Sequence, residues 1–168
     1  MGDTLITIVA IFLAAILMFV FPLSTISEMN DKEALAIVQS YTTDFVDNAR
    51  TKGKITSTDY DAFVQKLHAT GNSYDIEIEV QHADTNIGKK TSQQLVGDTI
   101  YYSEFTTQIT NYFPNDYLMK EGDYIVVYVK NNNTTLSQMI KGALYSVTGD
   151  QSYIISAQSS GTVVATGF

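Results

Sequence analysis

The stretch from Leu5 to Leu23 constrains this chain more than any other, because it has no charged residue and only Thr7 and Pro22 interrupt its apolar character. As a helix that rises about 1.5 Å per residue, it reaches roughly 28 Å, close to the ~30 Å hydrocarbon core of a bilayer. A lone segment in lipid must be helical, because its backbone N–H and C=O groups find no other partners there. The sequence therefore predicts one transmembrane helix near the N-terminus.

A cleaved secretory signal is the alternative interpretation of this stretch. Such a signal starts with basic residues and ends at a cleavage site of small residues. Here no Lys or Arg precedes the stretch, and residues 24–27 (STIS) offer only a weak cleavage site. We therefore expect the helix to remain attached and to have the lipid bilayer as a partner. The side chains expected to contact lipid or neighbouring copies are Leu5, Ile8, Ile11, Phe12, Ala15, Ile16, Phe19 and Pro22.

The helix is predicted to extend well beyond the bilayer. An apolar stripe at helical spacing follows the hydrophobic stretch, and it consists of Leu35, Val38, Thr42, Phe45 and Ala49. Gly53 is expected to end the helix, and Pro22 to kink it near its exit from lipid, because proline removes an internal hydrogen bond. The chain thus divides into an N-terminal helix (residues 1–53) and a globular head (residues 54–168).

The head is predicted to begin with a short helix and a strand. Thr56 is placed to cap the helix, apolar residues follow at helical spacing over residues 60–67, and Gly71 supplies the stop. Over residues 74–81 the period changes to two, with apolar residues alternating with acidic or polar ones. That alternation is typical of a strand with one buried and one solvated face.

The rest of the head mixes helices and strands. Residues 83–98 show no periodicity and are expected to form a loop, whereas residues 100–113 fit either a helix face or a strand; we favour a helix ended by Pro114. A central or doubly covered strand is predicted at 124–129, followed by a turn at 131–133. A helix closed by Gly149 is predicted at 136–147. The last prediction is a strand at 151–166 with a bulge or hairpin turn at Gly161. Because no regular βαβ repeat is present, the predicted class is α+β, a small, mostly antiparallel sheet with two or three short helices packed on the long one.

Charge and composition exclude several classes of function. The formal net charge is −8 and the pI is about 4.5, so no nucleic-acid partner is expected, since phosphate binding needs a basic surface. The absence of cysteine excludes disulfides and thiolate metal sites. No GxSxG, SxxK or glycine-rich phosphate motif is present. We therefore predict no enzyme activity, no catalytic residue and no cofactor.

The remaining candidates for chemistry are few. His68 and His82 lack metal-ligand spacing, so we expect them to be exposed or locally hydrogen-bonded, and we predict no metal site. Asp75, Glu77 and Glu79 share one strand face, which is expected to be a solvated surface that discourages edge-to-edge aggregation. Calcium binding is the alternative for these carboxylates, but no loop with calcium-ligand spacing accompanies them.

The N-terminal half resembles a known family. The run from Gly2 and Asp3 to Thr7 resembles the processing region of type IV pilins, and Pro22 lies near the position where pilin helices kink. Residues 45–71 are similar to Tad-type pseudopilin-like membrane proteins of Gram-positive bacteria, in which a helix, a turn containing Gly-x-Ile-Thr and a second short helix precede the sheet. The resemblance implies a candidate processing site at Gly2 and Asp3. It also implies self-association, or association with related subunits, through the N-terminal helix.

The first function expected from this organisation is structural: a pseudopilin-like subunit or accessory of a surface appendage or of a secretion or adhesion apparatus. The alternative is a membrane-tethered extracellular module that binds or adheres without polymerising. Either function places the chain in the cell membrane as a single-pass protein with an extracellular head, or in a surface filament.

Overall fold

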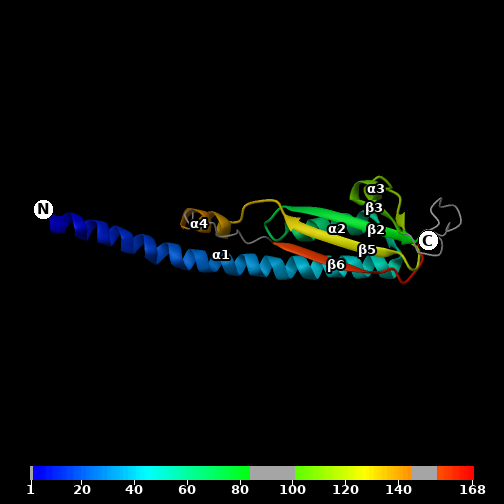
Figure 1. Ribbon diagram of the computed structural model, residues 1–168, viewed down its shortest axis with the longest axis horizontal. Helices are drawn as coiled ribbons and strands as arrows, with labels where there is room; N and C mark the ends of the chain where they lie inside the picture. Colours follow the sequence, from blue (N-terminus) through cyan, green and yellow to red (C-terminus); the bar gives the residue numbers. More distant parts are fainter. Residues whose placement is uncertain (1, 84–100, 145–154) are drawn as a thin grey trace, which may run out of the picture.

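The computed structural model describes residues 2–83, 101–144 and 155–168 and shows an α+β protein (Figure 1). One long helix runs the length of the molecule, and a small head of sheet and short helices packs against its C-terminal half (Figure 1). This confirms the predicted class. The loop predicted at 83–98 lies almost entirely outside the described residues, as do the end of the helix predicted at 136–147, with its stop at Gly149, and the start of the strand predicted at 151–166.

The long helix, α1, spans Gly2–Lys52, a length of 51 residues. It continues through Pro22, and its axis curves gently along the first half in place of a sharp kink (Figure 1). Gly53 ends it, as predicted, with a φ of 67°. Basic Arg50 and Lys52 lie in the last turn, where the helix dipole favours positive charge.

The C-terminal half of α1 provides one wall of the core. Its buried apolar side chains are Ala34, Val38, Phe45, Val46 and Ala49, and Leu35 packs at their edge. Thr42 lies fully buried among them, and its hydroxyl donates to the carbonyl of Val38 at 2.7 Å. The predicted stripe is therefore confirmed, and its one polar member is satisfied within the helix.

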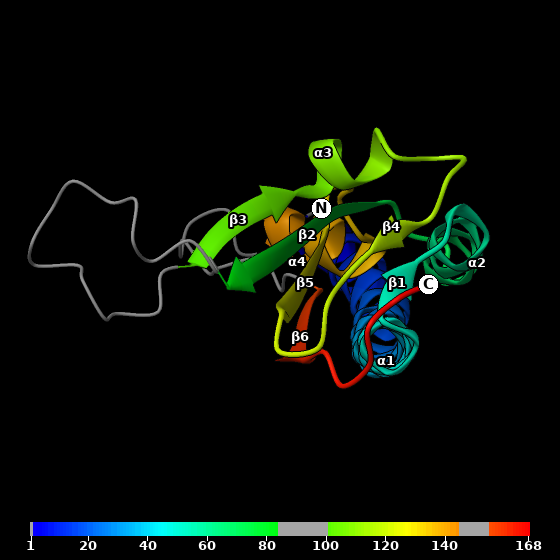
Figure 2. The same cartoon turned by 90° about the vertical axis from the view of Figure 1, so that its right-hand side faces the viewer.

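Within the described residues, the main sheet has four antiparallel strands in the order β3-β2-β5-β6. Their bounds are β2 Tyr74–Ala83, β3 Tyr101–Phe105, β5 Tyr124–Asn131 and β6 Ser156–Thr162. Figure 2 shows this sheet curving around α1, with β6 lying next to the helix. A separate two-stranded sheet pairs β1 (Lys54–Ile55) with β4 (Tyr117–Leu118).

Strand β5 is the central strand that the sequence predicts, but only one of its faces is covered. Ile125, Val127 and Val129 are fully buried against α1, whereas Val126 is half-buried and Tyr128 is exposed. In β2 the alternation is as predicted: Tyr74, Ile78 and Val80 are buried.

The short helices complete the head. Helix α2 spans Ser57–His68, and Thr56 caps it by accepting from the Asp59 amide at 3.0 Å, as predicted. Its Phe63 ring stacks on Phe45 of α1 with a centroid distance of 4.5 Å. Helix α4 spans Leu136–Leu144 and lies beside α1 at the end of the head nearer the N-terminus (Figure 1).

Besides the kink expected at Pro22, two sequence predictions need correction. The favoured helix over 100–113 is instead strand β3 followed by α3 (Thr106–Thr110), because pairing with β2 outweighs the local helix preference of the first half. Gly161 is neither a bulge nor a turn. It pairs in regular register with Ile125, and a Cβ built there would lie 3.0 Å from the guanidinium of Arg50, so glycine makes room for that side chain.

We expect Gly53→Ala to destabilise the head far more than Gly71→Ala. Both glycines have positive φ, which costs about 1–2 kcal/mol for any other residue. At Gly53 a Cβ would also overlap the backbone of Ala165 and Gly167, whereas at Gly71 nothing lies within 4 Å. We therefore expect a loss of at least about 2 kcal/mol at Gly53 beyond that at Gly71. Urea unfolding of the full chain in neutral detergent, followed by tyrosine near-UV circular dichroism, measures the difference; equal losses would contradict the close approach.

Candidate functional site: the exposed end of the N-terminal helix

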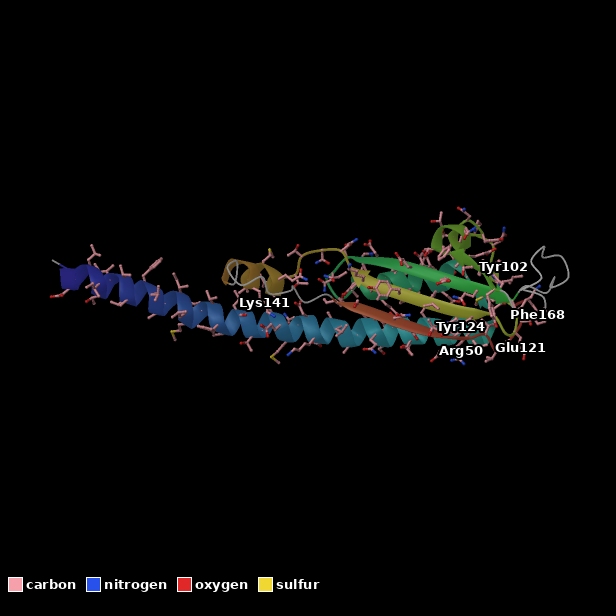
Figure 3. The ribbon with its side chains drawn as sticks, in the orientation of Figure 1. Arg50, Tyr102, Glu121, Tyr124, Lys141 and Phe168 are labelled. Carbon is pink, nitrogen blue, oxygen red and sulfur yellow. The ribbon has the colours of Figure 1, made fainter. Side chains whose placement is uncertain are left out.

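The N-terminal residues of α1, from 2 to 19, are not covered by any other described part of the molecule. Every residue from 2 to 19 is exposed, and the helix contains an 18-residue window with a mean hydropathy of 2.9, none of it buried. Figure 3 shows its side chains pointing outward on all sides. The predicted contact residues Leu5, Ile8, Ile11, Phe12, Ala15, Ile16, Phe19 and Pro22 are all exposed. We call residues 5–23 the anchor segment.

An apolar surface of this extent needs a cover. Phe12 is 69% exposed and Phe19 is 74% exposed, on a helix that is apolar around its whole circumference. Soluble monomers rarely expose contiguous apolar patches of more than a few hundred Å². Helices that are hydrophobic all round lie in a core or in a membrane.

Two threonine hydroxyls of this half are bonded within the helix. The Thr7 hydroxyl donates to the Asp3 carbonyl at 2.7 Å, and the Thr25 hydroxyl donates to the Phe21 carbonyl at 3.1 Å. A hydroxyl bonded in this way needs no water, so Thr7 can enter an apolar environment with the side chains around it. Pro22 lacks an N–H, which leaves the carbonyl of Met18 without its usual helix donor.

The packing of the head against α1 begins about one helical turn after the anchor segment. Ser27 is the first buried residue of α1, and its hydroxyl donates to the Leu23 carbonyl at 2.7 Å. On α4, Lys141 lies 3.4 Å from the Glu28 carboxylate (Figure 3), and the Thr135 hydroxyl donates to Asp31 at 2.9 Å. These contacts join the head to α1 next to the anchor segment, so the helix has no unpacked linker between the two parts.

The predicted processing residues lie at the free end of the helix. Gly2 and Asp3 are both exposed in the first turn of α1, and a side chain at Gly2 would meet nothing within 4 Å. The N-terminal position of Asp3 suits the positive end of the helix dipole.

No protein-family model, no curated protein and no solved structure matches this chain. What the structure shows is a single long apolar N-terminal helix that is compatible with a single-pass membrane anchor.

A second site, which sequence reasoning missed, is a chain of polar side chains in the head. His82, expected to be exposed or locally bonded, has a side chain that is only 12% exposed and bonds to residues distant in sequence. Its Nδ1 lies 2.7 Å from Asp123 Oδ2, and its Nε2 lies 2.7 Å from the Tyr117 hydroxyl. The Tyr117 hydroxyl also donates to Glu104 at 2.8 Å. Nothing in the sequence signals this cluster, because β2, β3, β4 and the turn before β5 each contribute one member.

Two carboxylates and one phenol make up the rest of this polar cluster. Asp123 Oδ2 accepts from the Lys120 amide at 2.7 Å and lies 2.7 Å from His82 Nδ1. The single proton of the Tyr117 hydroxyl goes to Glu104. Burial, reinforced by the bond to Glu104, raises the pKa of Tyr117, so its phenol stays protonated and acts as a donor.

The arrangement of these groups suits a structural role. Its hydrogen bonds connect the end of β2 to β3, to β4 and to the turn that precedes β5. Among the residues that the structure describes, no three His, Asp or Glu side chains gather so that they could hold a metal ion.

We expect Tyr117→Phe to destabilise the head by about 1–2 kcal/mol, because it leaves His82 Nε2 and the Glu104 carboxylate without their shared partner. Tyr112→Phe is the matched control: Tyr112 stacks edge-on against Tyr117 with a centroid distance of 5.3 Å but is 50% exposed. The free energy of urea unfolding at pH 7 is the measurement. Equal effects of the two substitutions would show that the buried chain contributes nothing.

Proposed function

We propose that this protein is a structural, pseudopilin-like subunit or accessory of a cell-surface appendage or of a secretion or adhesion apparatus, held in the membrane by its N-terminal helix. The observation that carries the proposal is α1 itself, which is apolar and exposed over residues 5–19 and whose second half forms one wall of the head core. In a bilayer, lipid covers the first half. In a filament, the same surface is covered by the helices of other copies or of related subunits.

The continuity of α1 favours assembly over simple tethering. The contacts of Glu28 with α4 and of Asp31 with Thr135, just before α4, begin within about two helical turns of Leu23, so the head keeps one direction relative to the anchor segment. A subunit that assembles through its helix needs such a fixed direction, because every head must take the same place in the array. A tethered binding module gains reach from a flexible linker, and none separates these two parts.

The second candidate is a membrane-tethered extracellular module that binds or adheres without polymerising. It is favoured by exposed aromatic side chains on and beside β3, namely Tyr101, Tyr102, Phe105 and Tyr112, of which the last lies just after α3. Exposed aromatic residues are enriched at protein interfaces. In either case the proposed location is the cell membrane, with one span and an extracellular head, or a surface filament in the first case.

We expect the double substitution Leu13→Lys with Leu17→Lys to release the protein from membranes. Each lysine near the centre of a span costs about 3 kcal/mol, and both positions are exposed on the apolar surface. The matched control is Ile26→Lys with Met29→Lys, which places two lysines at exposed positions of the same helix just past the anchor segment. Membrane fractionation is the measurement. Membrane retention of the first variant after carbonate washing would refute the anchor.

We expect material sheared from cells to contain the protein in filaments visible by electron microscopy, with a mature N-terminus at Asp3 by mass spectrometry. Because the chain has no cysteine, a single Ala14→Cys substitution reports on helix contacts without background. Disulfide-linked dimers should form in membranes through position 14, whereas Gln39→Cys, exposed on α1 at the level of the head, serves as the control. An intact Met1 on a monomer that never cross-links would overturn the structural proposal in favour of the tethered module.

A further inference from the structure

Strand β2 is paired on both sides over only three of its ten residues, Glu79 to Gln81. It pairs with β5 from Tyr74 to Gln81, but with β3 only from Glu79 to Ala83. At Thr106 the chain leaves the sheet and forms α3 (Figure 1). Residues 74–78 therefore form a sheet edge against which no strand of the described residues lies.

The backbone of this edge points outward. The Ile78 amide donates to the Thr106 hydroxyl at 2.7 Å, so Ile78 faces the β3 side, whereas the Ser73 carbonyl accepts from Asn132 on the β5 side. N–H and C=O groups alternate in direction along an antiparallel strand, so Tyr74 and Ile76 point the same way as Ile78. Thr106 covers Ile78, but no described residue pairs with the backbone of Tyr74 or Ile76 in this direction.

A groove of about 780 Å³ runs along this edge. Its lining includes Tyr60 and Val64 of α2, Thr106 and Thr107 of α3, and Ile76 of the strand itself. Proteins normally block an open edge with proline, lysine or a covering element. This edge has no proline or lysine, and residues 74 to 78 all line the open groove.

The two faces of the edge differ in chemistry. The inner face offers Ile76 beside Tyr60 and Val64, which suits apolar side chains. The outer face carries Asp75, Glu77 and Glu79, and hydrogen bonds from Ser103 and Gln81 lower the pKa of Glu79, so its carboxylate stays charged. Asp75 accepts from Asn132 at 2.8 Å, whereas the exposed Glu77 makes no hydrogen bond or ion pair with a described residue.

We propose that this edge of β2 binds an extended peptide segment of a partner protein, in which Lys or Arg alternates with apolar residues, by adding it to the sheet as a further strand. Backbone hydrogen bonds to Tyr74 and Ile76 hold the segment. Its basic side chains lie beside Asp75 and Glu77, and its apolar ones enter the groove toward Tyr60 and Val64. A second copy of this chain is disfavoured as the occupant, because its net charge of −8 repels the same carboxylates.

The test uses the full chain in neutral maltoside detergent and the blocked, fluorescein-labelled heptapeptide Thr-Lys-Val-Lys-Val-Lys-Thr. We expect saturable binding by fluorescence anisotropy, together with slower hydrogen exchange of the Ile76 amide by NMR. Glu77→Lys should weaken binding about tenfold, because a favourable cross-strand pair becomes a repulsive one. Glu121→Lys is the matched control, since Glu121 is an exposed acid in a turn away from the groove (Figure 3) and its replacement changes the net charge equally.

Additional peptides and one further variant distinguish strand addition from other modes of binding. The same peptide with N-methylated backbone amides should not bind, because it cannot complete the ladder, and a peptide with Glu in place of Lys should bind far more weakly. Ile76→Pro removes the outward N–H but none that faces β5, and it should also abolish binding. Equal binding by the methylated peptide, equal loss in both lysine variants, or no saturable binding would overturn the proposal. Protection of Ile76 that grows with protein concentration alone would overturn it in favour of a second copy.

Discussion

The structure depends on one helix that meets two different surroundings. The first half of α1 exposes apolar side chains around its whole circumference, and water is a poor solvent for that surface. The second half turns a single stripe, centred on Val38 and Phe45, toward the sheet and solvates the rest. Because both halves belong to one hydrogen-bonded rod, whatever covers the first half also sets where the head lies. The proposed function follows from this coupling more than from any feature of the head.

The head adds two features that do not depend on the anchor segment. The polar chain through His82, Tyr117 and Asp123 joins strands that meet only in the folded protein, so it stabilises one end of the sheet. At the other end the early departure of β3 leaves the backbone of β2 open beside Ile76. The polar cluster stabilises the fold of the head, and the unpaired edge of β2 is available to a partner. Both properties suit a subunit that contacts other proteins.

Sequence reasoning succeeded where the signal was local and periodic. The anchor segment, the stripe from Leu35 to Ala49, the Thr56 cap and the alternating strand from Tyr74 were all predicted, because each follows from spacing along one element. It failed at residues 100–113, where local preference permitted both a helix and a strand and pairing with β2 decided between them. It also failed for His82, because hydrogen bonds to positions 35 and 41 residues away leave no trace in local spacing.

By itself the sequence determined that this chain has one long apolar helix, an acidic head and an α+β mixture of elements, because burial of apolar residues and helix length are properties of a single segment. Only the tertiary structure decided which carboxylates are hydrogen-bonded and which, like Glu77, have no partner among the described residues. It also showed that a side chain at Gly53 or Gly161 would meet a neighbouring segment. It also decided that β2 keeps an open edge. Those properties depend on contacts between distant segments, and such contacts exist only after the chain has folded.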